Sequence, residues 1–141
     1  MKKWGSQLAL LWIIFLAWIV YHADTGTLPA MIARIYFIPY GDKVGHLLLM
    51  GTLALLLNFA FPSWRVHLFN ITLPAGSLLA GIIVTLEEFS QLFFKTRTFE
   101  LGDLAADYIG IALIGTFLFF WIRHFMKPEL TLSTRPISRT K

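Results

Sequence analysis

The sequence TLEEFSQLFFKTRTFELGDLAAD, residues 85–107, brings acidic, amide and basic side chains together in a chain that is otherwise strongly apolar. The chain of 141 residues is 57% hydrophobic and 14% charged, and its mean hydropathy is +0.68. These values are typical of a small helical membrane bundle and differ from those of an ordinary soluble domain. Residues 85–107 are therefore predicted to hold the end of one spanning helix, a polar loop and the start of the next helix.

Four apolar runs approach the length of about 20 residues that a helix needs to cross a bilayer. They are residues 4–21, 44–61, 69–94 and 104–122. A cleaved signal peptide is the alternative for the first run, but no A-x-A cleavage site follows it and further spans come after it. We predict an all-α, polytopic membrane protein with four transmembrane helices.

The segments between and after the spans are short. In the connection between the first two spans, apolar residues recur at the spacing of an amphipathic interfacial helix, at Leu28, Met31, Ile32 and Ile35. Residues 62–68 are expected to form a loop. Residues 1–125 then make one membrane domain, and residues 126–141 a basic tail that is expected to be disordered and close to lipid headgroups.

The basic residues predict the orientation. Most Lys and Arg residues fall on the side of the two termini, so both termini are expected in the cytoplasm. All acidic residues except Glu129 fall towards the other side. Because the basic residues are scattered between apolar runs, membrane lipids are the expected partners and nucleic acid is not. The chain has no cysteine, which excludes disulfides and thiolate metal sites.

Three spans are predicted to bring ionisable groups to one depth. With a rise of about 1.5 Å per residue, His46, Glu88 and Asp107 each start roughly 6–9 Å below the outer ends of their helices. On the third span the small residues and carboxylates share one face, opposite the bulky apolar residues. Glu87 borders that face and is expected to pair with Lys95. The predicted outward-facing pocket is lined by Asp42, Lys43, His46, Glu88, Gln91, Arg97, Asp103 and Asp107.

This pocket could carry several kinds of chemistry. His46 or Glu88 could act as a general base or proton relay. His46, Glu88 and Asp107 could instead hold a divalent cation. Arg97 and Lys43 at the rim could bind a phosphate or carboxylate group. No motif for an organic cofactor or a catalytic nucleophile is present.

Structural roles are the alternative for each of these residues. Asp42 and Asp103 could be helix N-caps. Arg97 could be an interfacial side chain that snorkels to the headgroups, or a partner for Glu88. A purely structural role is also open for His46, Gln91 and Asp107, which could simply hydrogen-bond or pack between helices.

The polar residues also follow a known pattern. It consists of Asp42-Lys43-x-x-His46, Glu88-x-x-Gln91, Arg97, Asp103, Gly110 and Gly115. In this order and spacing, over residues 40–116, the chain resembles the VanZ-like family of small bacterial membrane proteins, named for a member associated with resistance to the glycopeptide antibiotic teicoplanin. The resemblance implies a role in the bacterial cell envelope and a place in the inner membrane. Where the family usually has Asn, this chain has Asp107, which would raise metal affinity or force a shared proton.

The leading hypothesis is an inner-membrane protein that binds or modifies an anionic, lipid-linked envelope molecule. Whether it is an enzyme stays open. A proton-coupled transporter or flippase-like module, with Glu88 and Asp107 as its proton sites, is one alternative. A structural or partner-binding bundle, in which the polar layer only joins helices, is the other.

Overall fold

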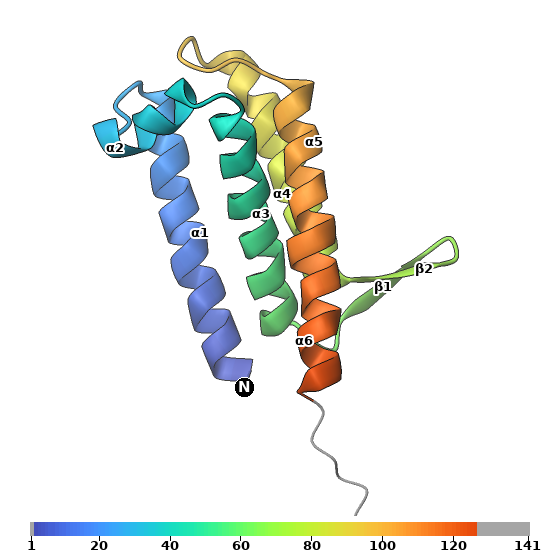
Figure 1. Cartoon of the computed structure of the whole chain (residues 1–141). Coiled ribbons are helices and arrows are strands. Elements are labelled where there is room, and N and C mark those ends of the chain that lie inside the picture. The colour runs from blue at the N-terminus through green and yellow to red at the C-terminus, as the bar shows by residue number, and fades with distance from the viewer. Residues whose placement is uncertain (1, 127–141) are drawn as a thin grey trace, which may run out of the picture.

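The computed structural model describes residues 2–126 (Figure 1). Its elements, in chain order, are α1 (Lys2–Asp24), α2 (Ala30–Ala33), the 3-10 helix η1 (Arg34–Phe37), α3 (Gly41–Ala60), β1 (Arg65–Leu68), β2 (Ile71–Pro74), α4 (Ala75–Ser90), the 3-10 helix η2 (Gln91–Phe93), α5 (Leu101–Gly110), the π-helix η3 (Ile111–Leu118) and α6 (Phe119–Phe125). The predicted short helix between the first two spans is present as α2 and η1. From residue 127 onwards, the predicted tail lies outside the described residues.

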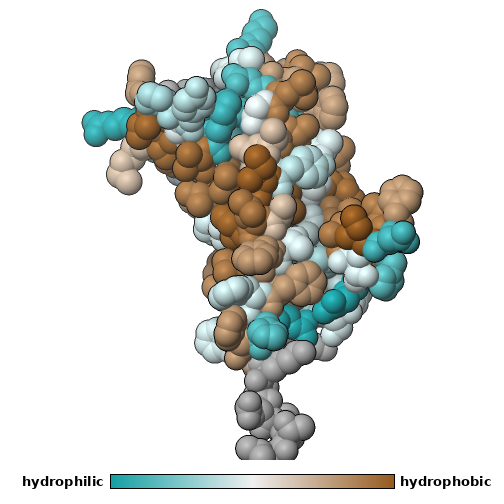
Figure 2. Space-filling model, turned by 45° about the vertical axis from the view of Figure 1, so that its right-hand side comes forward, coloured by the Kyte–Doolittle hydropathy of each residue, from teal (hydrophilic) through white to brown (hydrophobic). Residues whose placement is uncertain are grey.

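Four of the helical segments are long and apolar enough to cross a membrane, as predicted. They are Trp4–Asp24, Gly41–Ala60, Ala75–Phe93 and Leu101–Phe125. They run side by side, and α1 begins at the end of the bundle where α6 finishes (Figure 1). Hydrophobic side chains cover much of the middle of the molecule, while hydrophilic ones gather towards its two ends (Figure 2). This distribution matches what a bilayer-spanning bundle requires.

A β-hairpin corrects two of the sequence predictions. Strands β1 and β2 pair antiparallel from Arg65 opposite Pro74 to Leu68 opposite Ile71, where a loop and the start of the third span were expected. The prediction of an all-α chain was therefore wrong here, and the third span starts at Ala75, not at residue 69. Apolar and polar residues alternate in this short stretch, which suits a strand, and Pro74 immediately precedes the helix.

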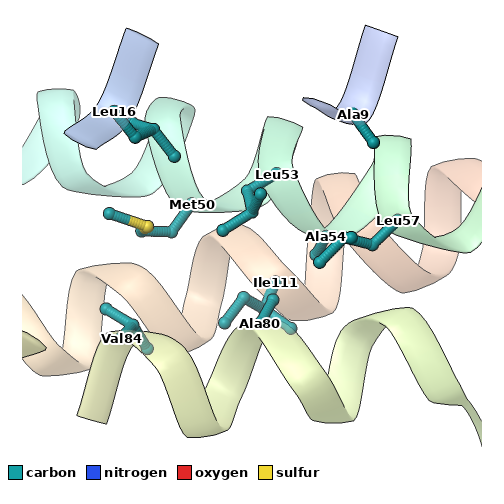
Figure 3. Close-up of a cluster of buried hydrophobic side chains, with 9 residues drawn as sticks. All are labelled: Ala9, Leu16, Met50, Leu53, Ala54, Leu57, Ala80, Val84 and Ile111. Carbon is teal, nitrogen blue, oxygen red and sulfur yellow. The ribbon is translucent and has the colours of Figure 1, made fainter. Parts of the chain in front are cut away.

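Helix α3 is the centre of the bundle. It packs against α1, α4, α5 and η3. A Cβ on Gly51 would lie 2.7 Å from the carbonyl oxygen of Gly110, so the backbones of α3 and α5 are in direct contact. Around this crossing lies the apolar core shown in Figure 3, made of Ala9, Leu16, Met50, Leu53, Ala54, Leu57, Ala80, Val84 and Ile111. The tight crossing fixes the positions of α3 and α5 beside the polar end.

The half of the bundle near the termini contains a buried polar contact that the sequence analysis did not single out. Asn58 is fully buried and donates hydrogen bonds of 2.8 Å to Ser77 Oγ and to the Gly115 carbonyl oxygen. Its own Oδ1 accepts the Ser77 N–H at 2.9 Å. These bonds join α3, α4 and η3. Because both ends of the amide have partners, Asn58 has a structural role.

Candidate functional site

The predicted polar residues meet at the end of the bundle opposite the start of α1 (Figure 1). Helices α3 and α5 begin there, α4 ends there, and residues 94–100 form the loop between α4 and α5. Together with the end of α1 and the segment from Gly26 to Ala33, they line a polar cavity of about 450 Å³, the size of a small-molecule site. Its walls include Asp42, His46, Gln91, Arg97 and Asp103.

The predicted facing of α4 is confirmed at most positions, while Leu78 on the expected lipid side and Glu87 on the expected inner side are half-buried. The side that was expected to face the bundle is buried, at Gly76, Ser77, Ala80, Glu88 and Gln91. The side expected to face lipid is exposed, at Ile82, Leu86, Phe89 and Phe93. The small residues let α4 approach α3 and α5 closely, and this brings Glu88 into the interior.

Lys43 joins one group of carboxylates. Its Nζ lies 3.1 Å from Asp42 Oδ2, 3.0 Å from Glu100 Oε2 and 3.0 Å from Asp103 Oδ1. Gly102 makes room for it, because a Cβ there would lie 2.9 Å from Lys43 Cε. The ammonium group occupies the place that a metal ion would take among these three oxygens. Lys43 is therefore paired with three carboxylates of the chain and is poorly placed to bind an anion.

His46 and Asp107 form a second polar contact, deeper in the bundle. His46 Nδ1 lies 3.1 Å from Asp107 Oδ1 and 3.2 Å from its Oδ2. The other ring nitrogen, Nε2, is 4.0 Å from Asp103 Oδ2. Asp107 is fully buried, whereas His46 reaches the wall of the polar cavity. The imidazole thus connects the buried carboxylate to the cavity.

Glu88 completes this second group from α4. Its Oε1 accepts the backbone N–H of Glu100 at 2.9 Å, and its Oε2 accepts the Gln91 side-chain N–H at 2.7 Å. Ligand atoms of His46, Glu88 and Asp107 lie within 4.8 Å of one another. We call these three residues the His46 triad. The structure brings together the three residues that the sequence analysis named as candidate metal ligands.

Arg97 links the loop to two helices. Its Nη2 donates to Glu87 Oε1 at 3.2 Å, and its Nη1 lies 3.8 Å from Asp24 Oδ1 at the end of α1. The expected pair of Glu87 with Lys95 was therefore wrong, and so was the alternative that made Arg97 a partner for Glu88. The chain turns after η2, so Arg97 folds back over α4, and Glu88 points inwards to α5 instead.

The N-cap alternative for Asp42 and Asp103 is also contradicted. The N-cap residues are Tyr40 for α3 and Glu100 for α5, and neither makes a side-chain capping bond. Asp42 and Asp103 lie in the first turns of α3 and α5, where a negative charge favours the helix N-terminus. Both carboxylates turn towards Lys43.

Two residues of the polar end were missed as site residues. Glu100 contacts Lys43 through its side chain and Glu88 through its backbone N–H. Asp24 lies beside Arg97, and its backbone oxygen accepts a 2.6 Å hydrogen bond from Thr96 Oγ1. The spacing of Glu100, three residues before Asp103, could have indicated that the two carboxylates lie close together at the start of α5. Asp24 carried no such signal beyond its place at the end of an apolar run.

Comparison with known proteins adds one similarity. No family model and no solved structure matches the chain. Over 100 residues, 71% of its length, the chain is 31% identical to an uncharacterized protein of Schizosaccharomyces pombe. The match covers 57% of that protein, so the chain spans little more than half of this relative's length. The relative's name states no activity, and the chemistry of the site has to carry the functional argument.

The charge balance limits what the site can bind. The described residues of this end hold seven carboxylates and four Lys or Arg side chains, and two of these cations, Lys43 and Arg97, are paired with carboxylates. Glu88 and Asp107 are both 0% exposed and form no ion pair with Lys or Arg among residues 2–126. A cation therefore fits the His46 triad, whereas a bare anion would be repelled.

Proposed function

We propose that this chain is a membrane protein that holds a divalent cation in the His46 triad and binds an anionic headgroup in the polar cavity through that cation and Arg97. The observation that carries the proposal is the convergence of one imidazole and two fully buried carboxylates, from three helices, to within 4.8 Å. Burying two carboxylates in an apolar bundle is costly unless positive charge lies between them.

The contrast between the two acidic groups supports this reading. The group of Asp42, Glu100 and Asp103 contains its own cation, Lys43, at hydrogen-bond distance from each carboxylate. The His46 triad has the same density of ligand atoms without such an ammonium group. One imidazole nitrogen and carboxylate oxygens suit ions such as Mn²⁺ or Zn²⁺.

A bound cation would also make anion binding possible in a cavity rich in carboxylates. His46 lies at the cavity wall, and Glu88 and Asp107 lie behind it. An ion held there by three protein ligands keeps coordination positions for headgroup oxygens. Arg97 lines the same cavity, and because among residues 2–126 only its Nη2 donates a hydrogen bond to a carboxylate, its other N–H groups offer a second contact for a phosphate or carboxylate.

The VanZ-like resemblance supplies the proposed setting. The resemblance favours the bacterial inner membrane, and the distribution of Lys and Arg favours both termini in the cytoplasm. The proposed ligand is then a lipid-linked molecule of the cell envelope, with a link to glycopeptide resistance. Because the similarity extends to a yeast protein, we define the ligand by its chemistry, an anionic headgroup, of which the envelope molecule is one example.

Counting bound ions tests the proposal. After chelation, the detergent-solubilised protein is expected to take up about one Mn²⁺ per chain in equilibrium dialysis, and Asp107→Asn is expected to weaken that binding at least about 10-fold. Glu100→Gln is the matched control, because it makes the same carboxylate-to-amide change in the group that holds Lys43. It should bind Mn²⁺ like the unaltered chain. Equal binding by the Asp107 variant, or no uptake at all, would contradict the proposal.

A further inference from the structure

A second cavity, apolar and of about 80 Å³, adjoins the polar one. The two share Asp42, His46 and Arg97 in their walls. The rest of the second cavity is lined mainly by apolar side chains of α1, α2 and α3, among them Leu16, Ile19, Val20, Ile32, Leu49 and Met50. One site thus has a charged compartment and an apolar compartment, joined at three charged or polar residues.

The apolar cavity follows from the way α1 crosses α3. Towards the termini the two helices touch, since a Cβ on Gly5 would lie 2.8 Å from the Phe59 carbonyl oxygen. Midway, the Trp12 indole N–H donates to the Leu49 carbonyl oxygen at 3.1 Å. At Gly45, near the polar end, a Cβ would meet nothing within 4 Å. The space next to Gly45 therefore results from the way α1 and α3 cross, with close contact towards the termini and none at Gly45.

The cavity also lies next to the surface that would face lipid. Among the long helices, α1 has its main contacts with α3 alone. On the turns of α1 that line the cavity, the other sides expose large apolar residues, namely Phe15, Trp18 and Tyr21. A hydrocarbon chain could pass from the bilayer along α1 into the cavity without crossing water.

We propose that the apolar cavity is a subsite for one hydrocarbon chain of the molecule whose anionic headgroup occupies the polar cavity. This inference rests on the proposed function and names the ligand class, a phosphate-bearing lipid. Each methylene removed from water multiplies the affinity roughly 4-fold, so an apolar wall beside Gly45 favours a chain. The charged residues shared by the two cavities match the boundary between headgroup and chain.

Arg97 is held at this boundary. Glu87 and Asp24 fix the guanidinium from α4 and α1, so it remains beside both cavities. Its position next to His46 allows one phosphate ester to contact the guanidinium and the cation of the triad together. A soluble phosphate would use only the polar half of the site, which gives the experiment a second ligand for comparison.

The test compares three probes on detergent-solubilised, Mn²⁺-loaded protein by native mass spectrometry. Dioleoyl phosphatidic acid has headgroup and chains, glycerol 3-phosphate has the headgroup alone, and dioleoylglycerol has chains alone. We expect phosphatidic acid to bind at least about 10-fold more tightly than either of the other two, since it fills both cavities. Equal binding of phosphatidic acid and glycerol 3-phosphate would overturn the chain subsite.

A cavity-filling variant locates the chain. Gly45→Leu places a side chain in open space and improves helix propensity, so we expect a folded protein that loses at least about 10-fold in affinity for phosphatidic acid. Ala105→Leu is the matched control, because residue 105 is exposed on α5. It should leave phosphatidic acid binding unchanged.

The Mn²⁺ count separates this inference from the proposed function. Gly45→Leu should still bind Mn²⁺ and glycerol 3-phosphate like the unaltered chain. If the variant keeps its full affinity for phosphatidic acid while Mn²⁺ binding is intact, the chain subsite is wrong and the cation site stands. If the unaltered chain binds phosphatidic acid equally well with and without Mn²⁺, the proposed function fails.

Discussion

Gly110→Ala is expected to destabilise the bundle by about 3 kcal/mol, the upper part of the usual range for overpacking. A Cβ at position 110 would overlap the carbonyl oxygen of Leu47, which is backbone and cannot rotate away. The change forces α3 and α5 apart at their tightest crossing. His46 directly precedes Leu47, and Asp107 lies about one turn before Gly110, so the variant should also bind Mn²⁺ more weakly.

The measurement is the midpoint of thermal or denaturant-induced unfolding in detergent. Gly45→Ala is the matched control, since it adds the same methyl group to a helix where a Cβ meets nothing within 4 Å. It should leave stability unchanged or raise it by up to about 1 kcal/mol, the difference in helix propensity. Equal midpoints for the two variants would show that α3 and α5 do not touch at Gly110.

Glu88→Gln is expected to have opposite effects on stability with and without metal. In metal-free protein the amide removes a buried negative charge near Asp107, so the unfolding temperature should stay the same or rise. The two hydrogen bonds of residue 88 can persist, because the new side-chain oxygen accepts from Glu100 N–H and the Gln91 amide can turn, at the loss of its longer contacts of 3.3–3.4 Å with Glu87. With Mn²⁺ present, the variant should lose the stabilisation that the unaltered chain gains, because only the carboxylate is a good ligand.

Thermal unfolding with and without about 1 mM Mn²⁺ distinguishes cation binding from a structural role. Free Mn²⁺ in excess over the dissociation constant stabilises the folded protein only if the protein binds it. If Glu88 only joins helices, Glu88→Gln should lower the unfolding temperature by the same amount in both conditions. Glu100→Gln again serves as the control and should keep its response to Mn²⁺. A uniform loss would contradict the cation account and favour the scaffold alternative.

The parts of the fold that could be predicted are those set by composition and helical periodicity. Apolar runs of sufficient length indicated four long helices, and the small residues of α4 indicated which side faces the bundle. The hairpin at residues 65–74 was missed because it is short and leads directly into the apolar helix α4. Its residues extended an apolar run, and hydropathy alone does not separate a strand from a helix.

The depth of the site residues along their helices was predictable to about one helical turn, but their contacts were not. Spacing from the helix ends put His46, Glu88 and Asp107 at one depth, and the structure places their ligand atoms together. The ion pairs could not be derived, because the path of the loop decides them. Arg97 reaches Glu87 and Asp24 only since the chain folds back after η2.

The central claim is that a divalent cation binds at the His46 triad, and the magnetic signature of the bound ion tests it most directly. We would load the solubilised protein with Mn²⁺ and record its electron spin-echo envelope modulation. The account predicts modulation from a nitrogen nucleus of one directly bound imidazole, which disappears in His46→Gln and persists in His22→Gln, a change to the histidine beside Thr27 at the end of α1. Bound Mn²⁺ without nitrogen coupling, or coupling that survives His46→Gln, would contradict it.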